Sequence, residues 1–488
     1  MDTVLLEKFD YVELDDGGIQ INKGKDKSIT EIVIPEGVTV LGNRAFSSFI
    51  KLRKVTLPST LKKLCGFCFG GCINLAEINL PEGLEVIESG AFSMTSDLKV
   101  VNVPKTVTEL NGYAFNEAHG LTAINVDPEN PKFRSIDGVL YNAEGDTLIY
   151  YPECKKGDFT VPESVKSINS WAFKKCHLGS LYIGEGVTSI FESAFELARS
   201  LDAITVAENN PRYRSDSNAL YTKDGKTLIK YAITSPDTEM TILPEVTSIN
   251  QSAFAYSTKL ERVIAPDGLK KIDRYGFYNA EGLKSIELGN GVEDIAGEAF
   301  SGCKNLQSIS FPDSIRTIGD NAFFGCSSLV EVSLPNSLTY LGNRPFIACN
   351  AITKLTYDGT TAEWEAINKT VCGIPEEAKL VLLRDPAPVE EPVEEPVEEP
   401  VEEAPADEPA EDAPEKKDND DKDIDALFNE IFGNDDKPEE EAKEPDEEIL
   451  SILSDGAITN KPNQEANQES AAPAPAKKKG LFARLFGK

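Results

Sequence analysis

The amino-acid sequence predicts a repeat solenoid in which a short strand from each coil joins a parallel β-sheet. Phenylalanine recurs along residues 29–357, and eight of the ten steps between successive phenylalanines are 22 or 23 residues long. The surrounding residues repeat with it, so one coil cannot bury its apolar face alone and must stack on its neighbours. These anchor phenylalanines are Phe46, Phe69, Phe92, Phe115, Phe173, Phe195, Phe254, Phe277, Phe300, Phe323 and Phe346.

Each repeat follows the template I-x-L-P-x-x-V-x-x-I-x-x-x-A-F-x-x-C-x-x-L. The alternation at 286–288 directs two apolar side chains inward and one outward, which is typical of a short strand. A turn follows, usually with a proline, as at Pro312. Apolar residues three apart, such as Val292 and Ile295, then lead into the Ala-Phe pair and predict a short helical or 3₁₀ turn. A period of about 23 residues is that of leucine-rich repeats.

The chain divides into segments of different composition. Residues 1–28 are expected to supply capping strands, and the solenoid is expected to span 29–384. Two steps between anchors are 58 and 59 residues long, and the extra residues at 127–158 and 207–238 resemble each other. Each insert has two apolar-aromatic runs around a polar turn, and Asp-Gly at 224–225 is a strong hairpin signal. We therefore predict two β-hairpins that project from one edge.

The last fifth of the chain is strongly acidic. Residues 385–488 contain 32 acidic and 11 basic residues, a net charge of −21 out of −33 for the whole chain. Residues 385–476 are rich in Pro and Glu, which predicts a disordered, extended linker. Two short apolar motifs lie inside it, at 425–433 and 447–453.

Residues 477–488 predict a basic amphipathic helix. Its apolar face would carry Leu481, Phe482, Leu485 and Phe486, and its basic residues are Lys477, Lys478, Lys479, Arg484 and Lys488. Such a helix is typical of a membrane-surface anchor, and it could equally dock on a partner protein. A second docking motif repeats its spacing with opposite surrounding charge, at Leu427, Phe428, Ile431 and Phe432.

Composition excludes several classes of function. An acidic chain binds nucleic acid poorly, because phosphate contacts need clustered Lys and Arg. The chain has only two histidines, His119 and His177, which argues against histidine-dependent catalysis and multi-histidine metal sites. No carboxylate pair, Ser-His-Asp order or Gly-rich phosphate loop stands out, so we expect no enzyme, no cofactor and no small-molecule substrate. The first ten residues lack a signal-peptide pattern and no apolar run is long enough to cross a membrane, so a cytoplasmic location is expected.

Most cysteines occupy one repeat position. Six of the nine follow an anchor or its periodic equivalent by three residues, where a cysteine acts as a small buried apolar residue. We predict that these are reduced packing residues, although stacked coils would also allow disulfides. The pair Cys65 and Cys68 forms a C-x-x-C that lacks the setting of a redox or zinc site. The six are Cys72, Cys176, Cys303, Cys326, Cys349 and Cys372.

Two surfaces are candidates for binding a partner. The outward strand position carries mostly small polar residues, and only Tyr182 there has the character of a binding hot spot. The edges of the inserts carry further aromatic residues, which packing against the solenoid would explain equally well. The candidate residues on the inserts are Tyr141, Tyr150 and Tyr221.

The array resembles the BspA-type leucine-rich repeats of gut and oral bacteria and some protists. The template, the inserted DGVLY…TLIYYP at 137–152 and the closing Y-D-G-T…E-W at 357–364 all carry this resemblance. It implies adhesion and protein–protein contact. The last twelve residues are similar to the C-terminal membrane-targeting helix of bacterial division ATPases of the MinD family, in the pattern K-x-G-[LF]-[LF]-x-R-L-F-G.

The sequence therefore predicts a non-catalytic protein-binding scaffold. A leucine-rich solenoid would hold a protein partner, and the acidic linker and basic helix would attach it to anionic membrane lipid or to a second protein. The alternative is a BspA-like cell-surface adhesin that binds host proteins.

Overall fold

The computed structural model describes residues 6–369, 373 and 379–384. The chain divides into two units, Met1–Glu395 and Pro396–Lys488, and the second lies outside the described residues. The predicted linker, its motifs at 425–433 and 447–453, the basic segment 477–488 and Cys372 all lie outside them as well. The described part is a parallel β-solenoid, which confirms the predicted fold class.

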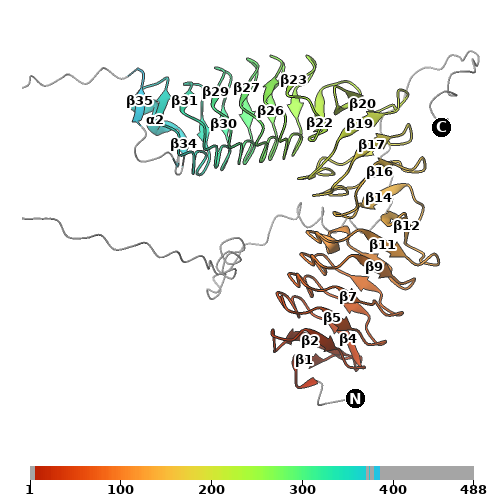
Figure 1. Cartoon of the computed structure of the whole chain (residues 1–488). Coiled ribbons are helices and arrows are strands. Elements are labelled where there is room, and N and C mark those ends of the chain that lie inside the picture. The colour runs from red at the N-terminus through yellow and green to blue at the C-terminus, as the bar shows by residue number, and fades with distance from the viewer. Residues whose placement is uncertain (1–5, 370–372, 374–378, 385–488) are drawn as a thin grey trace, which may run out of the picture. The chain divides into compact units, whose positions relative to one another are not determined.

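The first row of strands, called the strand face below, is formed by the I-x-L segments. They pair in parallel from coil to coil, with the central apolar residue buried and its neighbours exposed. Figure 1 shows them following one another along the solenoid in chain order. The strands are β3 (Glu31–Val33), β5 (Lys54–Thr56), β7 (Glu77–Ile78), β9 (Val100–Val103), β11 (Ala123–Val126), β15 (Phe159–Thr160), β17 (Ser180–Ile183), β19 (Ala203–Val206), β23 (Glu239–Thr241), β25 (Arg262–Ile264), β27 (Ser285–Glu287), β29 (Ser308–Ser310), β31 (Glu331–Leu334), β33 (Lys354–Tyr357) and β35 (Lys379–Leu382).

A second row of shorter strands lies in the same coils. The isoleucine of V-x-x-I, which the sequence placed before a helical turn, ends a two-residue strand in most coils, as Ile295 does in β28. The repeat therefore supplies two parallel ladders. The second consists of β4 (Val38–Leu41), β6 (Lys63–Leu64), β8 (Val86–Ile87), β10 (Glu109–Leu110), β16 (Ser167–Ile168), β18 (Ser189–Ile190), β24 (Ser248–Ile249), β26 (Lys271–Ile272), β28 (Asp294–Ile295), β30 (Thr317–Ile318), β32 (Tyr340–Leu341) and β34 (Asn368–Lys369).

Each anchor phenylalanine sits in a turn that we call the anchor turn, from two residues before it to two residues after it. At Phe46 the two end residues, Arg44 and Ser48, have φ angles of 57° and 59°, in the left-handed region. Their N–H groups donate to the next coil, to Gly66 O at 2.9 Å and Gly70 O at 2.8 Å. The turn backbone thus forms a further coil-to-coil ladder. A 3₁₀ helix, as predicted, forms at Gly112–Phe115.

The core is a column of stacked rings. Phe254 and Phe277 lie 4.6 Å apart with their planes 1° from parallel, and the stack continues to Phe346. The eight described cysteines are free thiols, and the five of them at the predicted repeat position are buried packing residues. The Cys303 thiol donates to the carbonyl oxygen of Phe277 at 3.1 Å, which satisfies a backbone acceptor inside the column.

Both inserts are built into the solenoid and do not project from an edge. In the first, β12 (Phe133–Ile136), β13 (Val139–Asn142) and β14 (Thr147–Tyr150) are antiparallel, and β14 pairs in parallel with β16. In the second, β20 (Tyr213–Asp216), β21 (Ala219–Thr222) and β22 (Thr227–Tyr231) repeat this order, and β22 pairs with β24. The inserts continue the second ladder because their last strand carries the same apolar alternation as the strands beside it.

The two ends of the array have different caps. At the N-terminal end, β1 (Phe9–Glu13) pairs antiparallel with β2 (Ile19–Gly24), which joins β4. Near the other end, helix α2 (Thr361–Ala366) begins with a capping box between Thr360 and Glu363. Its Trp364 packs on Tyr357 with ring centroids 5.3 Å apart, which covers the last coils.

Candidate protein-binding surface

The strand face is polar, and some of its side chains bond to side chains on neighbouring strands. Asn125 donates to Asn102 on the neighbouring strand at 3.0 Å, and Arg262 forms ion pairs with acidic residues on the strands either side of it. Tyr182 on β17 is 41% exposed and is the large aromatic residue of this face. Small side chains that already bond to one another offer a partner little apolar area to bury.

The tyrosines of the inserts do not form a surface. Tyr141 and Tyr221 are fully buried, and Tyr150 is nearly so, with its hydroxyl donating to Phe115 O at 3.0 Å. The sequence offered two interpretations of these residues, and the structure supports packing in the core. They cannot contact a partner while the solenoid is folded.

A larger group of aromatic and cationic residues gathers at the anchor turns on either side of the inserts. Five half-buried aromatic residues and three cations form two contacting groups there, and we call the two groups together the turn-edge cluster. Its residues are Tyr113, Trp171, Lys174, Arg199, Tyr256, Arg274, Tyr275 and Tyr278.

One half of the cluster is built around Trp171. Its ring meets the Tyr113 ring edge-on with centroids 5.3 Å apart. The Lys174 ammonium lies 5.1 Å from the Tyr113 ring centroid and 5.7 Å from that of Trp171, a favourable cation–π geometry. Lys174 and Glu196 form an ion pair at 2.8 Å with side chains only 12% and 13% exposed, and Glu196 also accepts from the indole N–H of Trp171 at 3.2 Å. The indole is therefore held on its face and at its polar edge.

The other half is a group of three tyrosines between two arginines. The Tyr278 ring contacts the Tyr275 ring at 5.3 Å and the Tyr256 ring at 5.8 Å, edge-on in both cases. Arg274 lies over Tyr275 with its guanidinium carbon 4.5 Å from the centroid, and Arg199 lies over Tyr256 at 4.9 Å. Guanidinium groups therefore lie at both ends of the aromatic group.

Glu196 joins the two halves across the second insert. Gln251, 55 residues further along the chain, donates to its carboxylate at 2.7 Å. Beside this contact, Asn250 donates to the carbonyl oxygen of Glu192 at 3.2 Å. Coils that the insert separates in sequence are thus fastened at the turn edge.

Three of these aromatic residues have an unfavourable backbone conformation. Trp171, Tyr256 and Tyr275 have φ angles of 58°, 66° and 61° at the end positions of their anchor turns. The equivalent positions of other coils hold residues such as Asn321 and Gly302, which tolerate this region better. A left-handed conformation costs about 1–2 kcal/mol for an ordinary residue. Large residues also stand at these ends in coils outside the cluster, such as Phe67, Met94 and Leu197, so the turn itself imposes the conformation.

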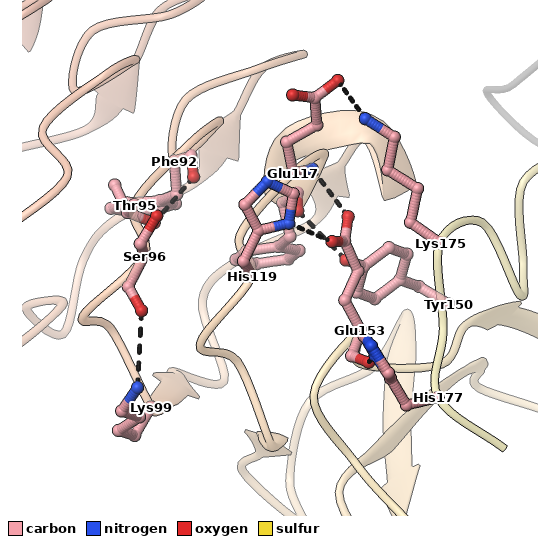
Figure 2. Close-up of polar contacts among 11 residues, drawn as sticks. Phe92, Thr95, Ser96, Lys99, Glu117, His119, Tyr150, Glu153, Lys175 and His177 are labelled. Atoms are coloured by element: carbon pink, nitrogen blue, oxygen red, sulfur yellow. Dashed lines mark hydrogen bonds and ion pairs between the residues drawn. The ribbon is translucent and has the colours of Figure 1, made fainter. Parts of the chain in front are cut away.

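A buried carboxylate fixes the turns across the first insert (Figure 2). Glu153 is 1% exposed and accepts from the Glu117 N–H at 2.7 Å and lies 2.8 Å from Nδ1 of His119. Its own carbonyl oxygen lies 2.9 Å from Nδ1 of His177. One residue thus contacts both histidines of the chain, from coils before and after the insert.

Above this carboxylate, Glu117 pairs with Lys175 at 2.7 Å. Burial acts to raise the pKa of Glu117, but its hydrogen bond and ion pair with Lys175 outweigh burial and lower that pKa. The pair remains charged at neutral pH. It closes the contact between the coils that carry Tyr113 and Trp171, which is why these two rings can meet.

Two other kinds of feature are absent from the part of the chain that the structure describes. The described residues contain no group of three or more His, Cys, Asp or Glu side chains that could hold a metal ion. In the same residues, no helix has the length and apolar character needed to cross a membrane. Both histidines belong to the Glu153 contacts.

The sequence prediction missed the turn-edge cluster because its residues occupy the variable positions of the template. Trp and Tyr stand at several ends of the anchor turns, but other coils hold equally large residues there, such as Arg44, Phe67 and Met94, so the sequence gives no distinct signal. Their contacts could not be foreseen without knowing which coils become neighbours across the inserts. The docking motifs at 425–433 and 477–488 lie outside the described residues.

The repeats, the anchor column and the paired ladders define a leucine-rich repeat solenoid. The sequence pattern described as the BspA type leucine-rich repeat region matches six copies in residues 20–137, 150–224 and 238–366. The chain belongs to this family, as the template and the closing segment predict. No curated protein matches it in sequence.

Several solved structures are similar to this chain. A leucine-rich cell surface protein from Faecalibacterium prausnitzii is 25% identical, with a TM-score of 0.53, and the match covers 74% of this chain and 96% of that one. The pneumococcal vaccine antigen PcpA is 18% identical, with a TM-score of 0.43 and coverage of 77% and 96%. A leucine-rich repeat protein from Eubacterium ventriosum is 19% identical, with a TM-score of 0.40 and coverage of 63% and 90%.

Proposed function

We propose that this chain is a non-catalytic protein-binding protein of the cell surface and that the turn-edge cluster is its contact surface. The observation that carries the proposal is a set of Trp, Tyr and Arg side chains held rigidly at the edge of the solenoid. These residue types dominate binding hot spots, because they bury large areas at little cost in side-chain entropy. The surface location rests on the similarity to the F. prausnitzii cell surface protein.

The cluster is a better contact surface than the strand face. Its rings are fixed by cation–π contacts and a half-buried ion pair, so a partner loses little by ordering them. The strand face offers one comparable side chain, Tyr182. We therefore place the contact at the anchor turns.

A photo-crosslinking amino acid tests the assignment without knowing the partner. We would place p-benzoylphenylalanine at Tyr278 in the cluster or at Tyr182 on the strand face, in the full chain expressed in its own cells. A discrete crosslinked product from position 278, absent from position 182, is the expected result. A product from position 182 alone would transfer the contact to the strand face.

Surface display has its own test. Intact cells would be treated with a protease or a membrane-impermeant biotin reagent, and residues 6–369 would be scored by mass spectrometry. Labelled peptides from the solenoid are expected. Protection in intact cells with labelling after lysis would contradict the location and favour the second candidate.

The second candidate is a cytoplasmic scaffold that the segment 477–488 attaches to anionic membrane. The pattern of five basic residues around two Leu-Phe pairs favours it, since each Lys or Arg adds about 1 kcal/mol on an anionic surface. Vesicle co-sedimentation of the full chain and of a chain ending at Ala476 is the measurement. Salt-sensitive binding of the full chain alone, to anionic vesicles only, would support it.

A further inference from the structure

We infer that the turn-edge cluster recognises an acidic segment of a partner polypeptide, with apolar side chains next to its carboxylates. The inference rests on the proposed function and names the chemistry of the partner. Guanidinium groups at both ends of an aromatic group match carboxylates on either side of apolar side chains.

The exposed charges of the cluster are positive. Arg274 pairs with Glu298 at 2.7 Å, but the side chain of Arg274 is 58% exposed and that of Glu298 only 26%. Arg199 is exposed and forms no ion pair among the described residues. What a partner meets first is therefore guanidinium, whose planar fork binds carboxylates through two hydrogen bonds.

The two carboxylates that contact the cluster are already engaged, and Glu298 pairs with Arg274. Glu196 accepts hydrogen bonds from Trp171 and Gln251 and pairs with Lys174. Only 13% of its side chain is exposed, so it cannot serve as the acidic partner of a further cation. A basic peptide would find no free acid in the cluster itself, whereas an acidic one finds Arg199.

The rings suit side chains of a polypeptide better than sugars. Lysine and arginine side chains lie over one face of Tyr113, Trp171, Tyr256 and Tyr275. Flat stacking of a sugar ring needs such a face to be free. The rings of the cluster meet edge-on, and apolar side chains of a polypeptide pack well against such aromatic rings.

The overall charge of the protein makes this preference specific. A chain with a net charge of −33 repels acidic polymers at long range and attracts basic ones. Binding of an acidic probe therefore requires a local site. Non-specific electrostatics would produce the opposite preference.

The test uses the full chain with Trp364→Phe, which leaves Trp171 as the single tryptophan of the two in the chain. Its fluorescence would be followed in 150 mM salt during titration with poly(Glu,Tyr), poly(Lys,Tyr) or heparin. Saturable change with poly(Glu,Tyr) alone is expected. Interferometry with the wild-type chain measures the same affinities and covers the case in which Trp364→Phe disturbs its cap.

Two double variants complete the test. Arg199→Gln with Arg274→Gln should weaken poly(Glu,Tyr) binding at least tenfold. Arg44→Gln with Arg344→Gln removes the same charge at anchor-turn ends outside the cluster and should leave affinity within twofold. Equal losses in both pairs would show general electrostatics and overturn the inference.

Other outcomes separate this inference from the function it rests on. Heparin binding with the same arginine dependence would overturn it in favour of an anionic glycan. Preference for poly(Lys,Tyr) would also overturn it. If no probe binds while position 278 still crosslinks, the partner chemistry is wrong and the contact surface stands. If position 278 does not crosslink either, both fail.

Discussion

Lys230 in β22 occupies the place that Tyr150 occupies in β14, and both side chains are buried. The ammonium group donates to Ser252 O at 2.7 Å, and burial lowers the pKa of Lys230 from its ordinary 10.5 to about 7. A buried lysine is a cost that the second insert carries and the first does not. The sequence identifies the pair of positions, but only the fold shows that this lysine has no route to solvent.

Lys230 predicts a pH dependence of stability. Its folded pKa lies below its unfolded value, so between about pH 7 and 10.5 the unfolded chain binds more protons and stability rises with pH. The slope is about 1.4 kcal/mol per pH unit at most. Thermal denaturation followed by circular dichroism should give a higher Tm at pH 8 than at pH 7, below the pH at which the unfolded thiols, with an ordinary pKa of 9.0, ionise and favour unfolding.

The variant Lys230→Met should raise the Tm at pH 7 and flatten this pH dependence. Lys226→Met, at an exposed lysine of the same insert, should keep the wild-type slope. Equal slopes in wild type and Lys230→Met would show that the side chain reaches water.

The cysteines predict a reactivity order. Burial raises the pKa of Cys72 and of Cys176 to about 12, whereas Cys154 is half-buried. Iodoacetamide at pH 8 should label Cys154 well before either of them, as read by peptide mass spectrometry. All three should react at similar rates in 6 M guanidinium. Fast native labelling of Cys72 would mean that its coil opens readily.

At the scale of the element, the anchor turn is where sequence and structure differ most. The alternation at the I-x-L segments predicts the strand face. The V-x-x-I pattern predicts that Ile295 points inward, but it does not predict the two-residue strand that Ile295 ends. The left-handed ends of the turn have no residue signature, because Trp171 and Gly302 occupy them alike. Hydrogen bonds to the next coil impose that conformation, and a single repeat read alone does not contain them.

Glu153 gives the element-scale prediction. Glu153→Gln keeps the shape of the side chain but replaces the carboxylate with a neutral amide. That carboxylate accepts the hydrogen bond from the Glu117 N–H and lies against His119. A hydrogen bond to a charged group contributes about 1.5–3 kcal/mol, so the free energy of unfolding in urea should fall by roughly that amount. Trp171 fluorescence, read in the Trp364→Phe chain where it is the single tryptophan, should change as well, because Tyr113 is no longer held against it.

The control is Glu144→Gln, at an exposed acid of the same insert, and should be nearly neutral. A loss of stability without any change in Trp171 fluorescence would mean that Glu153 does not position the cluster.

At the scale of the whole molecule, stacking makes the fold predictable and the surface hard to predict. Eleven anchors at a fixed period are sufficient to give the solenoid and its core column. The turn-edge cluster depends on contacts between residues 55 to 58 positions apart, such as Gln251 with Glu196. These contacts exist only because the coil after each insert stacks in register on the coil before it. The repeat period in the sequence does not show that this stacking occurs.

Register also predicts the effect of deletions. Removal of residues 301–323 takes out one whole coil and joins Phe300 to the residue that follows the next anchor. Each coil contacts its neighbours mainly, so this variant should fold and keep the elution behaviour and the circular dichroism spectrum of the wild-type chain. Removal of 301–311 breaks the period and should give an aggregated or unfolded chain in gel filtration. Equal behaviour of both would contradict a stack held by register.

The anchor turn has a consequence for change over generations and for engineering. Main-chain hydrogen bonds fix its end positions, and Trp, Tyr, Arg, Ser, Asn and Gly all occur there. Under the proposed function, the side chains offered to a partner can change one coil at a time, at a spacing of about 4.8 Å, without any change in the core. Substitutions at these end positions would let the protein follow a changing partner during evolution. A designer could vary the same positions to make new binding surfaces.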